Sequence, residues 1–440
     1  MTAPPEAASG QRSRPDRPRA AVIGAGISGL TAAYLLQRAC DVTLYEADDR
    51  LGGHAHTHAI ATADSRVVPL DSGFLVHNAR TYPWLIRLFT ELGVATQDTE
   101  MSMSVRCEGC GLEYAGSRGL RGLVPGGRVL ARPQYLAMLA AIPGFYRAAH
   151  RLLADPGGGT PPGGELITLA DFLRQGGYRR YFIAHFVIPL VSSVWSCPPA
   201  DALRYPARYL FEFLDHHGIL QLARSPSWRT VTGGSASYVD RVAKQLTTVA
   251  TGLPARQVRR VPGGAEVRDA DGSTRRFDRV VVATPPDLAL ALLAAPTPAE
   301  RQVLGAFRYA ASEVLLHTDA SVLPRAAGAR ASWNYLLRDC TAAAGNVHVS
   351  YHLNRLQRLR EPVDYLVTLN ALGRVRPDQV LRRMTYRHPV YDQDSVAAQR
   401  RLAGLNTPVL AYAGAYHGWG FHEDGCRSGV EAARALGVPW

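Results

Sequence analysis

The first clear pattern along the chain is a short apolar run, a glycine-rich turn, a helical stretch and a second apolar run. Residues 20–23 are apolar without a polar break, which predicts a buried parallel strand. Residues 30–38 have the spacing of a helix, residues 42–45 read as a second strand, and Glu46 follows directly. This order of elements predicts a β–α–β unit at the start of an α/β fold.

The turn in this unit carries three glycines, Gly24, Gly26 and Gly29, in the pattern G-x-G-x-x-G. Gly24 permits the tight turn, Gly26 lets the backbone approach a pyrophosphate, and Gly29 lets helix and strand pack closely. The phosphates would lie at the helix N-terminus, where free N–H groups favour negative charge. Glu46 stands where a carboxylate can accept the ribose hydroxyl groups. We therefore predict a dinucleotide site.

Beyond this unit, helical and strand-like patterns follow one another in blocks. Helical patterns cover residues 81–93, 132–153, 168–222, 238–246 and 428–436, and the third of these blocks is rich in aromatic residues. Strand-like patterns cover residues 257–277, which predict a meander, residues 277–284, and residues 409–413, with a further strand-rich block over 300–390. The run at 277–284 predicts a buried parallel strand that returns to the first sheet.

Composition and charge narrow the class of protein. A chain of 440 residues, 47% of them hydrophobic, can bury a large core and suggests two domains. No run of 18 apolar residues occurs, and residues 1–18 predict a disordered tail rather than a signal peptide, so we expect a cytoplasmic location. The net charge is +12 without a basic stretch interleaved with aromatic residues, so we expect no nucleic-acid partner. Association with an anionic membrane surface stays open, as does the oligomeric state.

Cysteine and histidine spacing gives weak metal signals. Cys107 and Cys110 form a lone C-x-x-C without a second pair, and we interpret them as the tip of a hairpin rather than a metal or redox site. His54, His56 and His58 alternate after a glycine pair, which favours a loop over the cofactor. We predict no metal site.

Four segments taken together resemble the FAD-dependent amine oxidase and phytoene desaturase superfamily: residues 22–30, 46–53, 277–284 and 413–429. The resemblance covers nearly the whole chain. It implies non-covalent FAD and a Rossmann-type FAD-binding domain interleaved with a mixed α+β substrate domain. The implied FAD-binding domain takes residues 19–80, 233–300 and 390–440, and the substrate domain takes residues 81–232 and 301–389.

The resemblance also assigns residues to the FAD. Ser28, Arg50 and the pair Gly52 and Gly53 are implied to contact the diphosphate, and Ala255 or Val258 the adenine edge. The backbone near Gly425 and Cys426 is implied to meet the pyrimidine or ribityl part of the flavin. His54, Thr284 and Gly414 are implied to lie in the same site. Where related amine oxidases carry an arginine, this chain has His54, and where many carry an acidic residue it has Ala415. The ribityl contact therefore falls to Glu423 or Asp424.

The loop before the last helix holds the candidate catalytic residues. His417, Trp419, Phe421 and His422 are expected to face the flavin ring. His422 or His417 could accept a proton, because an imidazole titrates near neutral pH. We expect the substrate pocket to be lined by Trp195, Trp333, Tyr335, Trp419 and Phe421.

Within the superfamily, the chain resembles most closely a bacterial subgroup of predicted flavoproteins linked to fatty-acid modification, through residues 52–57, 71–76, 316–319, 332–335 and 420–425. This implies an FAD-dependent oxidoreductase that dehydrogenates an apolar substrate, a lipid acyl chain, by hydride transfer to flavin N5. The only lysine, Lys244, matches poorly the lysine that assists oxygen in related amine oxidases. The alternatives are an amine or amino-acid oxidase, a tailoring oxidase of a secondary metabolite, a flavin-dependent double-bond isomerase, and a non-catalytic lipid-group-binding protein.

Overall fold

A five-stranded parallel sheet, in the order β10-β2-β1-β14-β20, joins segments that are far apart in the sequence. Its strands are β1 (Arg19–Ile23), β2 (Asp41–Tyr45), β10 (Thr248–Ala250), β14 (Arg279–Val282) and β20 (Leu410–Tyr412). β14 pairs in parallel with both β1 and β20, which confirms the predicted returning strand. The computed structural model describes residues 17–155, 166–221, 226–341, 345–371 and 373–440.

Both faces of the parallel sheet are covered. Along β1, Ala20 and Val22 belong to the core shared with α1 (Ile27–Leu36) and α15 (His422–Ala435), whereas Ala21 and Ile23 belong to the core on the opposite face. That opposite core includes the antiparallel meander β11 (Ala255–Val261), β12 (Gly264–Asp269) and β13 (Thr274–Phe277), which was predicted. Because neither face of the strand meets water, the run is apolar throughout.

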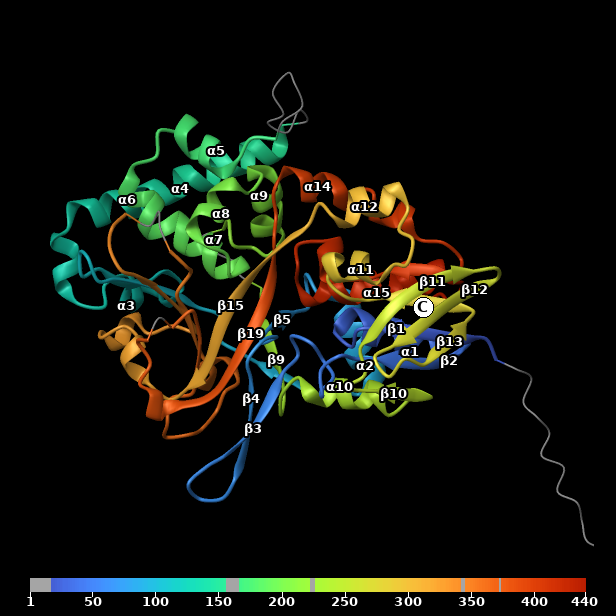
Figure 1. Ribbon diagram of the computed structural model, residues 1–440. Coiled ribbons are helices and arrows are strands. Elements are labelled where there is room, and N and C mark those ends of the chain that lie inside the picture. Colours follow the sequence, from blue (N-terminus) through green and yellow to red (C-terminus); the bar gives the residue numbers. More distant parts are fainter. Residues whose placement is uncertain (1–16, 156–165, 222–225, 342–344, 372) are drawn as a thin grey trace, which may run out of the picture.

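A second, seven-stranded sheet has the order β19-β15-β18-β17-β16-β7-β8. Its strands are β7 (Met103–Cys107), β8 (Glu113–Ala115), β15 (Arg308–His317), β16 (Trp333–Leu337), β17 (Val349–His352), β18 (Leu366–Leu369) and β19 (Val380–Val390). All pairings are antiparallel except that of β7 with β16. The long pair β15 and β19 runs from this sheet toward the parallel-sheet part of the molecule (Figure 1).

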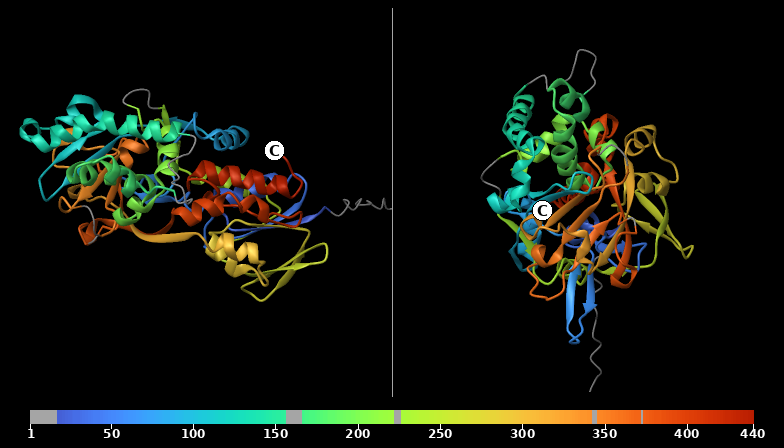
Figure 2. Two further views of the ribbon diagram at one scale, coloured as in Figure 1. Left: turned by 90° about the horizontal axis from the view of Figure 1, so that it is seen from above. Right: turned by 90° about the vertical axis from the view of Figure 1, so that its left-hand side faces the viewer.

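A helical layer packs against the seven-stranded sheet (Figures 1 and 2). Its helices are α3 (Gly119–Leu123), α4 (Pro133–Ala154), α5 (Leu169–Gln175), α6 (Arg180–Phe182), α7 (Ile188–Trp195), α8 (Pro199–Arg204) and α9 (Ala207–His216). A π-helical turn, Ile183–Val187, links α6 to α7. Among the described residues, the largest buried cluster combines side chains of this layer and of the sheet, and Phe145 has six aromatic neighbours there. The aromatic residues predicted over 168–222 thus form core.

The remaining elements connect or cover these layers. The small strands are β3 (Thr57–Ala61) with β4 (Val67–Asp71), and β5 (His77–Asn78), β9 (Trp228–Val231) and β6 (Thr96–Asp98). The further helices are α2 (Pro83–Leu92), α10 (Ala236–Ala243), α11 (Pro286–Leu292), α12 (Pro298–Leu304), α13 (Leu353–Leu356) and α14 (Gln393–Gln399). Among the described residues, no helix combines the length and apolar character needed to cross a bilayer.

One sequence prediction needs correction. The last helix begins at His422 and not at Ser428. Its early glycines suggested a loop, but Gly425 and Gly429 lie against α1, where a Cβ at either position would collide with Ser28 or its neighbours. The predicted tail of residues 1–18 falls mostly outside the described residues. Arg17 and Pro18 are described, and they bond to Gln37 and across to Asp41. The domain ranges stay a prediction.

Candidate functional site

The glycine turn after β1 is closed by short backbone contacts. The N–H of Gly24 donates to the carbonyl of Tyr45 at 2.8 Å, and Gly24 has a φ of +99° that favours glycine. A Cβ on Gly29 would lie 1.8 Å from the carbonyl oxygen of Gly24, so no other residue fits there. Gly26 differs, because a Cβ there would meet nothing within 4 Å. The open side of the turn is therefore at Gly26, where the pyrophosphate was predicted.

A second loop closes against the first. The N–H of Gly52 donates to the carbonyl of Ala25 at 2.9 Å, and a Cβ on Gly53 would lie 3.1 Å from the Cα of Gly26. The carboxylate of Glu46 accepts from the N–H of Ala25 at 2.7 Å and from the N–H of Asp48 at 3.0 Å. The predicted diphosphate and ribose residues are thus brought to one place.

Three features of this place fit a bound dinucleotide. The hydroxyl of Thr284 is buried beside Gly24 and has no hydrogen-bond partner. The ion pair of Arg50 with Asp48 is long, at 3.8 Å, so its guanidinium keeps donors for an anion. Gly26, the N-cap of α1, leaves space at the helix N-terminus. Ser28 is 5% exposed and lies beneath Gly425, so its hydroxyl is close to α15.

The start of α15 offers hydrogen-bond donors one turn earlier than predicted. The N–H of Gly425 already donates to the carbonyl of Phe421 at 3.0 Å, and the thiol of Cys426 accepts from the Thr31 hydroxyl at 3.5 Å. The first N–H groups of a helix lack partners within it. In α15 these belong to His422, Glu423 and Asp424. Gly425 and Cys426 themselves pack against α1.

The two acidic residues at the start of α15, Glu423 and Asp424, both bond to neighbouring groups of the protein. The carboxylate of Glu423 accepts from the N–H groups of Trp84 and Leu85, both at 3.0 Å, and so caps the N-terminus of α2. The carboxylate of Asp424 accepts from the N–H of Phe421 at 3.1 Å and pairs with Arg427 at 3.3 Å. Burial raises the pKa of Glu423 to about 7 and that of Asp424 to about 6. A contact of Glu423 or Asp424 with the ribityl chain of the flavin stays a prediction.

The other predicted FAD contacts lie after β20 and on β11. Gly414 lies two residues after the end of β20, and its N–H donates to the Ser428 hydroxyl at 2.9 Å. Val258 is buried, and its carbonyl accepts from the N–H of Ala294 at 3.0 Å. Ala255 begins β11 beside a register shift, which loosens the strand pairing there. Of the two candidates for the adenine edge, Ala255 therefore has the less committed backbone.

His54 lies in a buried cluster of rings. Its ring centroid is 5.0 Å from that of Tyr386 and 5.2 Å from that of His388, and its Nε2 has no partner. Burial and the Arg50 guanidinium lower the pKa of His54 to about 4, and burial lowers the pKa of His388 to about 3. His56 bonds to the Tyr386 hydroxyl at 2.9 Å. These imidazoles are neutral at pH 7, and the unpartnered nitrogen of His54 is free to bond a ligand.

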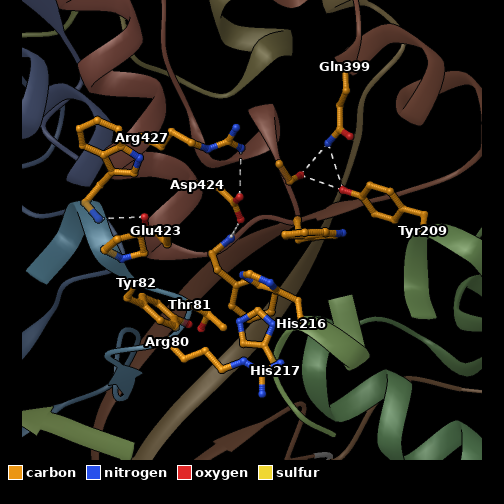
Figure 3. Close-up of a pocket in the computed structure, with 15 residues that line it drawn as sticks. Arg80, Thr81, Tyr82, Tyr209, His216, His217, Gln399, Glu423, Asp424 and Arg427 are labelled. Atoms are coloured by element: carbon orange, nitrogen blue, oxygen red, sulfur yellow. Dashed lines mark hydrogen bonds and ion pairs between the residues drawn. The ribbon is translucent and has the colours of Figure 1, made fainter. Parts of the chain in front are cut away.

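A hollow of about 360 Å³ opens at the start of α15 (Figure 3). Its lining comes from the segment before α2, from α9, from α14 and from the C-terminal loop and helix. The lining residues are Arg80, Thr81, Tyr82, Pro83, Trp84, Tyr209, His216, His217, Gln399, Gly418, Trp419, Phe421, Glu423, Asp424 and Arg427. The hollow brings together four predicted site residues: Trp419, Phe421, Glu423 and Asp424.

The predicted aromatic pocket is only partly gathered here. Behind the hollow, the indole N–H of Trp195 donates to the carbonyl of Trp419 at 3.1 Å, and Phe421 stacks on Phe213 with centroids 4.6 Å apart. Trp333 and Tyr335 do not line the hollow. They lie on β16, inside the seven-stranded sheet, where the Trp333 ring meets Tyr351 edge to face. β16 pairs with β17 on one side and with β7 on the other, and α7 packs against it.

The two candidate catalytic histidines are poor bases. Burial and Arg427 lower the pKa of His417 to about 3. His422 stacks on Phe74 with centroids 3.8 Å apart, its Nε2 lies 3.2 Å from the Tyr238 hydroxyl, and desolvation lowers its pKa well below the ordinary value. Proton acceptance works best with a pKa near the working pH. Their catalytic role remains a prediction that these surroundings disfavour.

Several lining residues carried no local signal in the sequence. Arg80, His216, His217 and Gln399 reach the hollow from separate segments, and Gln399 bonds there to the Tyr209 hydroxyl at 3.1 Å and to the Gly418 carbonyl at 2.6 Å. Only tertiary folding brings them together. The aromatic density of α9 was the one available hint, and it favoured core as strongly as a ligand site.

Comparison with known proteins identifies a family whose model matches most of this chain. The family model described as flavin containing amine oxidoreductase matches residues 27–327. Tryptophan 2-monooxygenase of Agrobacterium tumefaciens (strain Ach5) is 52% identical over 56 residues, which are 12% of this chain and 7% of that protein. The chain therefore matches only a small fraction of the length of these curated relatives.

Solved structures share the fold across both chains. A triple mutant of putrescine oxidase has a TM-score of 0.67 at 16% identity, covering 95% of this chain and 98% of the other. A CLA-producing fatty acid isomerase from P. acnes has a TM-score of 0.64 at 18% identity, with the same coverage. At such identities the likeness is one of fold, and this fold serves proteins with different substrates.

Proposed function

This chain belongs to the family of flavin containing amine oxidoreductases, and on that premise we propose that it removes two hydrogens from an apolar acyl chain with an anionic or neutral head group. It is an FAD-dependent oxidoreductase with the amine-oxidase-like fold. When bound, FAD supplies the two-electron acceptor for such a reaction. The substrate class is argued from the residues of the hollow.

The proposal rests on which charged side chains of the hollow already have bonding partners. Glu423 and Asp424, its two lining acids, are occupied by backbone N–H groups and Arg427. A cationic amine would need an uncommitted carboxylate, because burying an unpaired charge is costly. Arg80 is exposed at the same hollow, and within the described parts of the chain no carboxylate pairs with it. The uncommitted charge is thus positive and suits an anionic group.

The walls suit the apolar part of such a substrate. Tyr82, Trp84, Trp419 and Phe421 line the hollow, and Trp195 and Phe213 pack behind them. Each methylene group taken from water into such surroundings contributes about 0.8 kcal/mol. A long acyl chain therefore gains binding energy without any specific polar contact.

The position of the chain's only lysine does not favour oxygen as the electron acceptor. Lys244, the chain's only lysine, caps the end of α10 with its side chain exposed to solvent. A lysine that assists oxygen has to act inside a dry site. This supports a dehydrogenase over a fast amine oxidase.

A proton acceptor is needed when a C–H bond of an acyl chain is broken. Among the ionisable groups that line the hollow, the Glu423 carboxylate has a pKa of about 7. Each of its oxygens accepts one backbone bond and keeps a second lone pair, so the carboxylate can still take up a proton near neutral pH. We assign this role to Glu423 in place of His417 and His422. The carboxylate is held in position by its bonds to Trp84 and Leu85.

Exposed leucines in the helical layer support access to lipid. Leu120, Leu130 and Leu136 are 80%, 51% and 43% exposed, and they lie on consecutive helical segments together with Arg121. Apolar side chains flanked by arginine are typical of contact with an anionic lipid surface. A lipid-borne substrate would be taken up from such a surface.

The proposal is tested by product analysis. The FAD-loaded protein is incubated with free fatty acids, phospholipids and a panel of amines, each with an artificial electron acceptor, and the products are identified by mass spectrometry. We expect acyl products that have lost two hydrogen atoms. Oxidised amines as the only products would refute the substrate class. Acyl products of unchanged mass with a shifted double bond would refute dehydrogenation in favour of isomerisation.

A further inference from the structure

Four side chains from three distant segments converge where β7 ends. Cys107 and Cys110 belong to the hairpin between β7 and β8, His185 to the π-helical turn before α7, and Cys340 to the segment after β16. Their three sulfur atoms and one imidazole nitrogen all lie within 4.8 Å of one another. Cys107 and His185 are buried, Cys110 is half-buried and Cys340 is exposed.

The separations match the edges of a metal-centred tetrahedron. Zn²⁺ binds sulfur at about 2.3 Å and imidazole nitrogen at about 2.0–2.1 Å, so a regular tetrahedron has S···S edges of about 3.8 Å and S···N edges of about 3.6 Å. The Sγ atoms of Cys107 and Cys340 are 3.8 Å apart, and Sγ of Cys110 is 3.6 Å from Nε2 of His185. Both are far longer than a disulfide bond of about 2.05 Å.

His185 is oriented as metal-binding histidines are. Its Nδ1 lies 3.0 Å from the backbone carbonyl of Tyr181, and a carbonyl can only accept, so Nδ1 carries the proton. The lone pair of the neutral ring is then on Nε2, which faces the three sulfurs. Tyr181 stacks on the ring at 3.9 Å, and the Tyr114 hydroxyl donates to the carbonyl of His185 at 2.8 Å.

The hairpin is shaped around its two sulfurs. The backbone N–H groups of Cys110 and Leu112 are directed toward the sulfurs of Cys107 and Cys110, respectively. A sulfur that faces N–H donors is favoured as a thiolate. A Cβ on Gly109 would lie 2.9 Å from the Cα of Asp339, so this glycine lets the hairpin approach the segment of Cys340. Arg132 donates to the carbonyl of Cys110 and brings positive charge to the cluster.

We propose that Cys107, Cys110, His185 and Cys340 bind one Zn²⁺ as a structural Cys₃His site. Three thiolates with one imidazole are a donor set that selects zinc among the available divalent ions. Binding releases the three thiol protons to solvent and changes no oxidation state. With four protein ligands the metal keeps no open position, which distinguishes a structural site from a catalytic one.

Such a site would fix the helical layer to the seven-stranded sheet. The π-helical turn of His185 runs directly into α7, whose last residue, Trp195, bonds to Trp419 behind the hollow. The metal would therefore anchor one end of the helix whose other end supports the hollow. The site does not depend on which substrate the enzyme uses.

The test is metal analysis of the purified FAD-loaded enzyme, expressed in zinc-supplemented medium. We expect close to one zinc per chain after exhaustive dialysis. Protein grown with cobalt instead should show the ligand-field bands of tetrahedral Co²⁺ at wavelengths beyond the flavin absorption. Zinc far below one equivalent, or a disulfide among Cys107, Cys110 and Cys340 in the non-reduced protein, would overturn the proposal.

Variants separate this site from adventitious binding. Cys340→Ser leaves the buried packing intact because Cys340 is exposed, and His185→Gln removes the nitrogen ligand. Each should lose zinc to a chelator at least about tenfold faster than the parent enzyme, as expected when metal ligation is weakened. Cys40→Ser is the matched control, since Cys40 contacts Arg279 outside the cluster. Equal zinc retention in Cys340→Ser, His185→Gln and Cys40→Ser would contradict the assignment.

Discussion

The carboxylate of Glu46 accepts a hydrogen bond from the backbone N–H of Ala25 at 2.7 Å, which ties the end of β2 to the glycine turn after β1. The same carboxylate accepts from the N–H of Asp48. Two backbone bonds hold Glu46 beside the open face of Gly26. The residues predicted to contact the ribose and the diphosphate are thus held in place by backbone hydrogen bonds.

Gly26→Ala is expected to weaken FAD binding without unfolding the protein. A Cβ at Gly26 has open space and the residue has a φ of −69°, so alanine fits the backbone. The methyl group would occupy the approach to the pyrophosphate, and we expect affinity for FAD to fall by roughly tenfold to a hundredfold. Titration of the apoprotein with FAD measures this.

Gly144→Ala is the control for that variant. A Cβ there also meets nothing within 4 Å, but the residue lies in α4. It should keep the parent affinity for FAD. Gly24→Ala should instead lower the unfolding temperature, because its Cβ would lie 2.8 Å from the carbonyl oxygen of Ala283 at a φ of +99°. Unchanged FAD affinity in Gly26→Ala would place the diphosphate elsewhere.

Replacement of Glu423 should separate its two roles. Glu423→Gln keeps one carbonyl oxygen for one of the two N–H groups that Glu423 binds, and it cannot accept a proton, so we expect normal FAD content, a small loss of stability and a large loss of kcat. Glu423→Ala also leaves the N–H groups of Trp84 and Leu85 without their cap, which costs about 1 kcal/mol of stability. Thermal unfolding and steady-state kinetics measure both effects. Normal kcat in Glu423→Gln would show that Glu423 only caps the helix.

The rate should rise with pH in a way that depends on Glu423. Its carboxylate has to be ionised to accept a proton, and burial raises its pKa to about 7. We therefore expect kcat to increase between about pH 6 and pH 8. The profile in Glu423→Gln should be flat over this range. A rising profile that persists in the variant would assign the titration to another group.

Arg80→Gln should affect substrate binding more than turnover. Loss of an uncommitted guanidinium at the hollow removes a contact for an anionic head group, and we expect KM for fatty acids to rise roughly tenfold with kcat little changed. Arg174→Gln, at an exposed position on α5, is the charge-matched control. A phospholipid without net charge should be insensitive to Arg80→Gln. Equal effects of both variants would exclude a head-group role.

Acid should destabilise the folded protein. Burial lowers the pKa of many imidazoles to about 3 or 4, among them those of His54, His56, His58, His77, His217, His317, His348, His388 and His417. Between about pH 4 and pH 6.5 the unfolded chain therefore binds protons that the folded chain does not, so stability falls as pH falls. The raised pKa values of Asp71, Glu423 and Asp424 act in the opposite direction, but they are fewer.

Unfolding temperatures measured from pH 7 to pH 5 test this prediction. We expect a steady decrease toward pH 5, with a shallower slope in His388→Gln, which removes one buried imidazole. An unfolding temperature that rises toward pH 5 would contradict the account of buried neutral histidines.

The features that could be predicted from the sequence are those that residues close together in the chain determine. The glycine turn, the β14 strand and the β7–β8 hairpin all follow from neighbouring residues. The start of α15 could not be predicted, because Gly425 closes a glycine-rich run that is typical of a loop until its contact with α1 is known. The Cys₃His cluster was missed for a different reason. His185 is 75 residues from Cys110, and Cys340 is 233 residues from Cys107, so no local spacing reveals the set.

The most direct test of the proposed substrate class is anaerobic reduction of the bound flavin by a matched pair of substrates. Octadecanoic acid and octadecylamine carry the same chain and differ in the head group, so only the charge preference of the hollow separates them. Flavin absorbance is followed after mixing each with the FAD-loaded enzyme in the absence of oxygen. We predict bleaching by the acid, or by a phospholipid carrying the same acyl chain, and none by the amine. Bleaching by the amine alone would contradict the account.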